Sequence, residues 1–217
     1  MPILEKMDDF FNSRAETYDS HMLVDMNLGE FYKEIAALVI TGKQDMSLLD
    51  LGCGTGLELE RLFVKYPDMQ VTGVDLSFEM LDGLRAKYKD KNVDLICGSY
   101  FDVQFGSDYD VVLSTYSLHH FNEFEKFIIY KKVFKSMKPG GIYIEGDYTV
   151  KTDEEQALYV SELKRLKREQ NLDSGNFYHY DTPMTAENQI KLLKSAGFAG
   201  AEVVKQWEST SIITAKK

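Results

Sequence analysis

Leu48-Leu49-Asp50-Leu51-Gly52-Cys53-Gly54-Thr55-Gly56 is the stretch of this chain that decides its fold. It is an apolar run that ends in three glycines at alternate positions, which is typical of a buried strand turning sharply into a helix. The helix is indicated by the apolar side chains that follow at i, i+3, i+4 and i+7, namely Leu59, Leu62, Phe63 and Tyr66. The glycines predict either a tight turn without a ligand or a place where a ligand presses against the backbone.

The alternation of strand and helix continues along the chain. Ser77 is a candidate helix cap, Asn122 and Glu125 form a capping-box pattern, and Lys138-Pro139-Gly140-Gly141 is a strong helix stop. Strand-like runs lie at Ser47–Leu51, Gln70–Asp75, Val93–Cys97, Tyr109–Ser114, Gly141–Glu145, 201–206 and 210–215. This order predicts an α/β fold with a doubly wound, mostly parallel, seven-stranded sheet between helices. Any ligand is expected at the carboxyl ends of the strands.

The chain is expected to form one domain, because it contains no repeat and no linker rich in Pro or Gly. Residues 1–46 are expected to be a helical cap with two helical patterns, and residues 47–150 the ligand-binding core. Residues 151–183 are expected to be a helical insertion over the substrate pocket. Residues 184–217 are expected to hold the last helix and a C-terminal strand pair.

Composition excludes several classes of protein. The 217 residues carry 35 acidic and 25 basic side chains, a net charge of −10, so a nucleic-acid partner is not expected. The densest basic run, Lys164-Arg165-Leu166-Lys167-Arg168, lies in a helical pattern among glutamates and is interpreted as a solvated helix face. No apolar stretch of about 18 residues predicts a membrane span, and the first residues lack a signal-peptide pattern. Cys53 and Cys97 lack CxxC spacing, so we expect a reduced, cytoplasmic protein without a zinc site.

The glycine spacing separates two kinds of nucleotide site. A dinucleotide fingerprint needs a third glycine at position 57, where this chain has Leu57. An NAD-linked oxidoreductase is therefore the less favoured interpretation. Asp75 ends the next strand, where a carboxylate can accept hydrogen bonds from both hydroxyls of a ribose. The alternative for Asp75 is that it caps a helix or binds water.

These motifs resemble those of the class I S-adenosylmethionine-dependent methyltransferases. The resemblance covers about residues 45–150, and it rests on Asp50–Gly56, Asp75 and Lys138-Pro139-Gly140-Gly141. Ser77-Phe78-Glu79-Met80-Leu81 is similar to a run found after the ribose-binding acid in that family, and residues 10–19 resemble the helix that covers the cofactor. The resemblance implies a Rossmann-like methyltransferase fold and S-adenosylmethionine as cofactor. The whole chain most resembles small bacterial members with unassigned substrates.

The resemblance also implies roles for individual residues. The glycine loop would run beneath the methionine part and the ribose, Asp75 would bind the ribose, and Leu76 and Met80 would flank adenine. Ser99 stands where the family commonly has an acid that bonds the adenine amino group, and Asp102 is close enough to substitute. The expected cofactor-binding residues are Tyr18, Asp50, Gly52, Cys53, Gly54, Asp75, Leu76, Met80, Ser99, Tyr100 and Ser114.

Candidate catalytic residues follow from the chemistry of methyl transfer. The transfer is an in-line displacement, so the protein mainly aligns the acceptor, and a general base is needed only when the acceptor arrives protonated. His119 follows the fourth strand and is expected to be a base, an orienting donor or a packing residue. One of the two adjacent residues His119 and His120 is expected to face away from the site. His179 and Asp181 lie in the aromatic loop Tyr178–Asp181, which is expected to cover the acceptor pocket or to be an ordinary surface loop.

Two further expectations concern the same pocket. Tyr18, Asp19 and His21 are expected to close it from the N-terminal side. His119, His179 and Asp181 could hold a metal ion, but ligands scattered over loops are weak evidence, so no metal is expected.

The expected class of methyl acceptor follows from a motif that this sequence lacks. Methyltransferases of nucleic-acid bases share an Asp/Asn-Pro-Pro-aromatic run after the fourth strand, and this chain has Ser114-Thr115-Tyr116-Ser117 there. A small-molecule acceptor is therefore expected, with the chain a monomer or a homodimer. A non-catalytic protein that binds S-adenosylmethionine or S-adenosylhomocysteine is the alternative.

Overall fold

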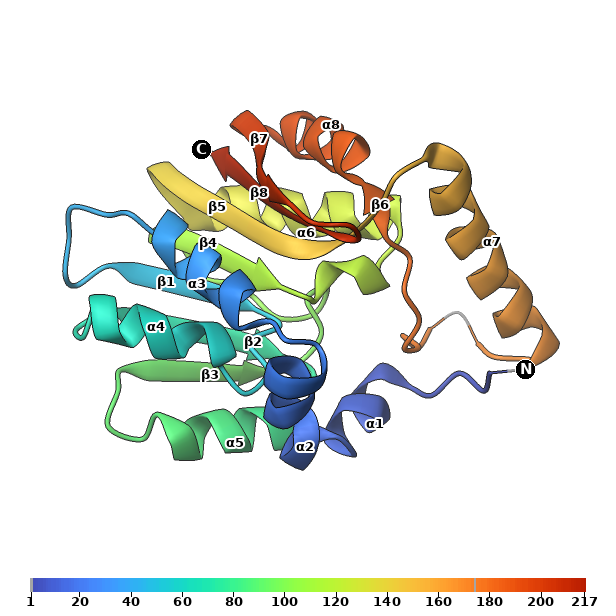
Figure 1. Cartoon of the computed structure of the whole chain (residues 1–217), viewed down its shortest axis with the longest axis horizontal. Helices are drawn as coiled ribbons and strands as arrows, with labels where there is room; N and C mark the ends of the chain where they lie inside the picture. Colours follow the sequence, from blue (N-terminus) through green and yellow to red (C-terminus); the bar gives the residue numbers. More distant parts are fainter. Residues whose placement is uncertain (1, 174) are drawn as a thin grey trace.

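The centre of the molecule is a sheet in which seven strands pair in the order β3-β2-β1-β4-β5-β8-β7 (Figure 1). The computed structural model describes residues 2–173 and 175–217; Met1 and Ser174, within the expected 1–46 and 151–183 segments, lie outside the described residues. A two-residue strand, β6, pairs with β5 beside this path. The strands are β1 (Ser47–Leu51), β2 (Gln70–Asp75), β3 (Val93–Cys97), β4 (Tyr109–Thr115), β5 (Met137–Val150), β6 (Met184–Thr185), β7 (Ala199–Gln206) and β8 (Thr210–Lys216).

The directions of the strands determine at which edge of the sheet a ligand is expected to bind. β1 to β5 run parallel to one another, and β8 is antiparallel to both β5 and β7. The mostly parallel, seven-stranded path is confirmed. From β1 the chain builds outward to β2 and β3 on one side and to β4 and β5 on the other. The carboxyl ends of β1 and β4 therefore border a topological switch point, where sheets of this kind bind ligands.

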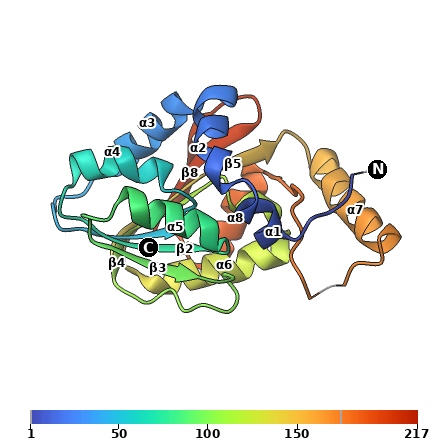
Figure 2. The same ribbon diagram turned by 90° about the horizontal axis from the view of Figure 1, so that it is seen from below.

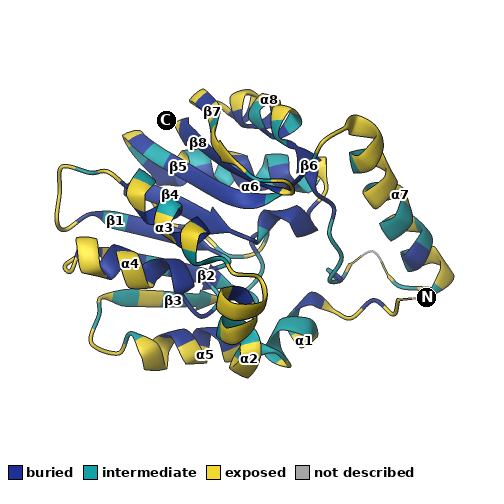
Figure 3. Ribbon diagram, in the orientation of Figure 1, coloured by how far each residue is buried: buried dark blue, intermediate teal, exposed yellow. Residues whose placement is uncertain are grey.

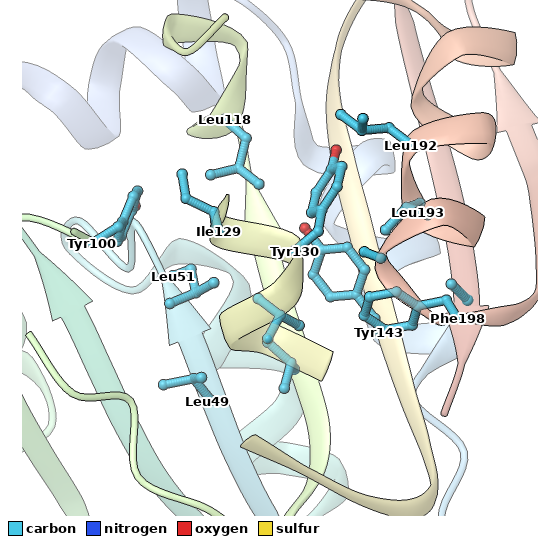
Figure 4. Close-up of a cluster of buried hydrophobic side chains, with 14 of the residues drawn as sticks. Leu49, Leu51, Tyr100, Leu118, Ile129, Tyr130, Tyr143, Leu192, Leu193 and Phe198 are labelled. Carbon is cyan, nitrogen blue, oxygen red and sulfur yellow. The ribbon is translucent and has the colours of Figure 1, made fainter. Parts of the chain in front are cut away.

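Helices cover both faces of the sheet, as expected (Figure 2). Side chains alternate along the central strands, so that Leu48 and Val111 pack with α3 and α4 while Leu49 and Val112 pack on the opposite face. Figure 4 shows part of this second cluster, in which Tyr130 of α6 meets side chains of β5 and α8. The helices on the sheet are α3 (Gly29–Leu38), α4 (Leu57–Lys65), α5 (Phe78–Lys87), α6 (Glu123–Ser136) and α8 (Ala186–Ala196).

Helix boundaries follow local chemistry. The Ser77 hydroxyl accepts the Met80 N–H at 3.2 Å, and Asn122 and Glu125 form the complete capping box at the start of α6. α6 ends at Ser136, and the next strand follows without an intervening turn. β5 begins at Met137 and extends to Val150, so the predicted strand Gly141–Glu145 is too short at both ends.

The N-terminal segment holds more helices than the two patterns predicted. Two short helices, α1 (Met7–Asn12) and α2 (Ala15–Ser20), continue through a π-helical turn (His21–Asp25) before α3. α1 and α2 contact α5 at the ligand edge of the sheet. None of the helices in the described ranges is long and apolar enough to cross a membrane.

α7 (Asp153–Glu169) lies at the edge of the molecule and is exposed along most of its length (Figure 3). Its buried residue, Leu166, packs with Leu4 and Tyr178. Gln170, which follows α7, accepts the Leu4 N–H and donates to the Pro2 carbonyl. These contacts join α7 to the extended N-terminal residues and to the loop before β6.

Candidate functional site

The glycine loop turns the chain at the carboxyl end of β1. Gly52 and Gly54 have φ values of 71° and 46°, in the left-handed region that side chains rarely adopt. A Cβ on Gly52 would lie 2.2 Å from Ser117 Oγ, so this glycine is required by close packing. A Cβ on Gly54 would meet nothing closer than 3.8 Å, where Tyr18 lies. Gly54 therefore presents its backbone to open space.

Asp75 joins the glycine loop to the next helix. One carboxylate oxygen accepts the Gly54 N–H at 2.9 Å, and the other accepts the Ser77 N–H at 2.8 Å. Burial raises the pKa of this carboxyl, and the backbone N–H groups oppose that shift. Since each carboxylate oxygen can accept two hydrogen bonds, Asp75 keeps acceptor capacity for a ligand.

These groups line a narrow cavity of about 60 Å³, here named the inner cavity. Eight of the eleven predicted cofactor-binding residues line it: Tyr18, Gly52, Gly54, Asp75, Leu76, Met80, Ser99 and Tyr100. Its other lining residues are Met7, Phe11, Gly98, Tyr116, Ser117, His120, Phe121 and Phe177. Asp102 is exposed and does not line the cavity, so Ser99 alone is available where the family's adenine-bonding acid would stand.

Three predicted residues lie beneath the cavity instead of in its wall. Asp50 is fully buried, because side chains alternate along β1 and its own points to the same face as Leu48. Burial and the neighbouring Glu58 carboxyl raise the pKa of Asp50. Cys53 and Ser114 are buried as well. These three side chains do not line the inner cavity, so a direct contact of each with the cofactor stays a prediction.

The roof of the inner cavity consists of aromatic side chains that sequence reasoning missed. Phe11 comes from α1 and Phe177 from the loop before β6. Two backbone hydrogen bonds hold the two segments together: the Met7 N–H donates to the Phe177 carbonyl at 3.0 Å, and the His179 N–H donates to the Glu5 carbonyl at 3.0 Å. They form an antiparallel bridge between Lys6 and Tyr178. The resemblance of residues 10–19 to a covering helix was the available signal for Phe11. The aromatic loop that begins at Phe177 was expected over the acceptor pocket, and Phe177 instead lines the inner cavity.

A second cavity, here named the outer cavity, adjoins the first and has a volume of about 580 Å³. Phe11, Tyr18, Tyr116 and His120 line both cavities. The remaining lining of the outer cavity is polar and aromatic: Phe10, Arg14, Thr17, Ser20, His21, Met22, Asp25, His119, Tyr148, His179 and Asp181. All three predicted catalytic residues therefore face one space.

Two predicted parts of this wall lie elsewhere. Asp19, which was expected to close the pocket, bonds the Thr55 hydroxyl and pairs with Lys87 at 3.4 Å. Asp19 thus joins α2 to the glycine loop and to the end of α5. In the described part of the chain, α7 contributes no lining residue to either cavity, and only the loop after it, through Phe177, His179 and Asp181, reaches them.

His119 lies between two carboxylates. Its Nδ1 is 2.5 Å from Asp147 Oδ1, its backbone N–H donates to Asp147 Oδ2 at 2.8 Å, and its Nε2 is 3.4 Å from Asp181 Oδ1. Burial alone would lower the pKa of His119, but Asp147 and then Asp181 raise it to about 9. In the metal-free chain the ring is therefore a cation at neutral pH, suited to donating a hydrogen bond and not to removing a proton.

His120 also faces the site, which corrects the expectation that one of the two histidines points away. Residues Leu118–His120 form a 3₁₀ turn, and both rings reach Asp181 Oδ1 at 3.4 Å. Burial and the neighbouring His119 lower the pKa of His120. His179 stacks on Phe10 with ring centroids 3.5 Å apart, and burial lowers its pKa to about 4.

A network of buried polar side chains lies in the core close to Asp147 in the sequence of β5. Glu145, two residues earlier in β5, accepts hydrogen bonds from Tyr130, Tyr143 and Gln189 at 2.8, 2.9 and 3.1 Å. Burial raises the pKa of Glu145, and the positive charge of the fully buried Lys126 of α6 opposes that rise. His119 and then Lys126 lower the pKa of Asp147. No sequence pattern indicated this network, because its members come from α6, β5 and α8.

Comparison with known proteins identifies a family. The family described as "Methyltransferase domain" matches residues 48–141. Carboxy-S-adenosyl-L-methionine synthase of Wolinella succinogenes is 30% identical over 200 residues, 83% of this chain and 80% of that protein. Malonyl-[acyl-carrier protein] O-methyltransferase of Priestia megaterium is 31% identical over 132 residues, 60% of this chain. The match spans 47% of that relative, so this chain corresponds to about half of its length.

Solved structures share the fold. A complex described as DhpI-SAM-HEP superposes with a TM-score of 0.71 and 19% identity, covering 96% of this chain and 95% of that chain. A DhpI-SAH complex superposes equally well, with a TM-score of 0.71. Both neighbours carry the sheet and helices described above.

Proposed function

This chain belongs to the class I S-adenosylmethionine-dependent methyltransferase family, and from that membership we propose that it transfers a methyl group from S-adenosylmethionine to a small-molecule acceptor. The observation that carries the proposal is the pair of adjoining cavities at the carboxyl edge of the sheet. The inner cavity is the proposed cofactor site, and the outer cavity is the proposed acceptor site. Their shared wall, which includes His120, is where the reacting atoms would meet.

The residues of the inner cavity fit the proposed cofactor. Asp75 offers carboxylate oxygens to the two ribose hydroxyls, and Gly54 leaves the space that a methionine chain needs. Leu76 and Met80 supply apolar contacts for adenine, and Ser99 can bond its polar edge. When bound, S-adenosylmethionine supplies a methyl group on a positively charged sulfur.

The residues of the outer cavity would align the acceptor. His119, as a cation, would donate a hydrogen bond to an acceptor oxygen and hold it in place. His120 lies between the two cavities and has a lowered pKa, so its neutral ring can accept a proton from an acceptor that arrives protonated. Asp181 and His179 close the same wall. Aromatic rings from α1, α2 and the loop before β6 favour a compact organic acceptor.

The partners and the location of the enzyme are proposed from its charge and its cysteines. The net charge of −10 supports an acceptor other than nucleic acid. The free thiols Cys53 and Cys97 support a cytoplasmic location. We propose one methyltransferase domain, acting as a monomer or a homodimer.

Two measurements test the proposal. Calorimetric titration should give saturable binding of S-adenosylmethionine and S-adenosylhomocysteine at one molecule per chain, and no heat with NAD. A library of small acceptors, followed by release of S-adenosylhomocysteine, should then identify turnover. NAD binding in place of S-adenosylmethionine would overturn the proposed cofactor. Tight cofactor binding without transfer to any acceptor class would favour a non-catalytic binding protein.

A further inference from the structure

Three potential metal ligands converge in the wall of the outer cavity: His119, His120 and Asp181, here named the histidine–carboxylate cluster. Their ligand atoms all lie within 4.8 Å of one another, although the 3₁₀ turn and the loop before β6 are far apart in the sequence. Two backbone and hydroxyl contacts fix the loop on the turn, because Thr182 donates to the His119 carbonyl from N–H at 2.6 Å and from Oγ at 3.1 Å. These hydrogen bonds fix the loop that carries Asp181 against the turn that carries His119 and His120.

Two of the three separations between ligand atoms in the cluster match a tetrahedral ion. Asp181 Oδ1 is 3.4 Å from His119 Nε2 and 3.4 Å from His120 Nδ1. Bonds of about 2.1 Å to a tetrahedral zinc ion place neighbouring ligand atoms about 3.4 Å apart. Two imidazoles and one carboxylate are also a donor set used by catalytic zinc and by non-haem iron, each of which keeps an open position.

Asp147 provides the second observation that points to an ion. It is almost fully buried and contacts the other ring nitrogen of His119, Nδ1, at 2.5 Å. Histidine ligands commonly donate their second N–H to such a carboxylate, which orients the ring and strengthens it as a ligand. Asp181 forms ion pairs with His119 and His120 and with no lysine or arginine in the described residues.

We propose that His119, His120 and Asp181 bind a divalent transition-metal ion, with Zn²⁺ as the representative ion, and that Asp147 positions His119 for it. The ion's open position faces the outer cavity, which these three residues line. Its role there rests on the proposed function. In the metal-bound protein the ion would replace His119 and His120 in aligning the acceptor: the open position would hold an oxygen or nitrogen atom of the methyl acceptor beside the inner cavity.

Metal binding is measured on chelator-treated full-length protein without S-adenosylmethionine, so its failure is separate from failure of methyl transfer. Calorimetric titration with Zn²⁺ should saturate at one ion per chain, whereas Mg²⁺, which prefers oxygen ligands, should give no comparable binding. Co²⁺ should give the intense visible absorption of a tetrahedral site. No saturable Zn²⁺ binding would overturn the proposal.

Variants locate the ion. Asp181→Asn removes a ligand from a partly exposed side chain and should leave the fold intact while weakening Zn²⁺ binding strongly. Asp147→Asn keeps all three ligands and should weaken binding about 10- to 100-fold. Asp25→Asn is the matched control, because Asp25 lines the same cavity but pairs with His21. Equal Zn²⁺ affinity in Asp181→Asn and wild type, or loss in Asp25→Asn instead, would contradict the assignment.

Discussion

Asp75 serves the fold and the proposed cofactor with the same carboxylate. Its oxygens accept the N–H groups of Gly54 and Ser77, which fixes the glycine loop against the start of α5. The same side chain lines the inner cavity. A structural role and a binding role therefore have to be separated by measuring stability and affinity together.

Replacing Asp75 with Ala should weaken S-adenosylmethionine binding about 10- to 100-fold, because buried ribose hydroxyls left without an acceptor cost about 1–3 kcal/mol. Asp75→Asn should weaken it less, since the amide retains one acceptor oxygen. Calorimetry measures the affinity and circular dichroism the fold. Asp102→Ala is the control, because Asp102 lies outside the cavity wall. An Asp75→Ala protein that binds normally would place the ribose elsewhere.

The glycines of the loop should respond differently to the same substitution. Gly52→Ala should mainly lower the free energy of unfolding, because its Cβ would collide with Ser117. Gly54→Ala should cost about 1–2 kcal/mol of stability from left-handed strain, and its Cβ should additionally obstruct the cofactor. Urea unfolding and calorimetry on both variants check the contrast. Equal cofactor affinity in Gly54→Ala and wild type would show that the loop is only a turn.

At the scale of elements, the roof over the inner cavity depends on a few polar contacts. Asn12, at the end of α1, accepts the Ser77 hydroxyl at 2.7 Å and the Glu79 N–H at 3.3 Å. These bonds fasten α1 to the first turn of α5. Part of the roof over the inner cavity therefore depends on one side chain of α1.

Asn12→Ala should therefore loosen α1 without unfolding the protein. Each lost hydrogen bond is worth about 0.5–1.5 kcal/mol. Amide hydrogen exchange in α1 should become faster, while exchange in the central strands stays unchanged. Asp9→Asn, on the exposed side of the same helix, should leave the exchange of α1 as in wild type. Equal protection of α1 in Asn12→Ala and wild type would show that the roof is held by its aromatic contacts alone.

Sequence reasoning succeeded for elements whose signals are local. The cap at Ser77, the capping box at Asn122 and the strands β1 to β4 depend on neighbouring residues, and the structure contains them. It failed where distant segments decide. The length of β5 depends on its pairing with β8, and the roof formed by Phe177 depends on a contact between the N-terminus and a loop near residue 180.

At the scale of the whole molecule, buried charges link the core to the proposed acceptor site. Lys126 and Glu145 lie inside the protein, Asp147 follows in β5, and His119 and Asp181 continue to the outer cavity. Sequence patterns could not predict this chain of charges, because each member looks like an ordinary polar residue of its own element. The same limit applies to Asp50: its motif was recognised in the sequence, but its burial beside Glu58 was not.

Lys126→Met should lower the free energy of unfolding by about 1–3 kcal/mol, because the buried Glu145 carboxyl loses the cation that opposes its raised pKa, while Asp147 keeps His119. Urea unfolding followed by circular dichroism measures the change. Lys131→Met, on the exposed side of α6, is the control and should have little effect. Equal stability of the two variants would show that the Lys126 charge does not balance this network.

The central claim is that the inner cavity holds the methyl donor and directs its sulfur toward the outer cavity. A crystal structure of the protein with S-adenosylhomocysteine tests it most directly. We predict that the ribose hydroxyls lie within hydrogen-bond distance of Asp75 and that the sulfur lies at the wall near His120. The product bound in the outer cavity, or with its sulfur turned away from His120, would contradict the account.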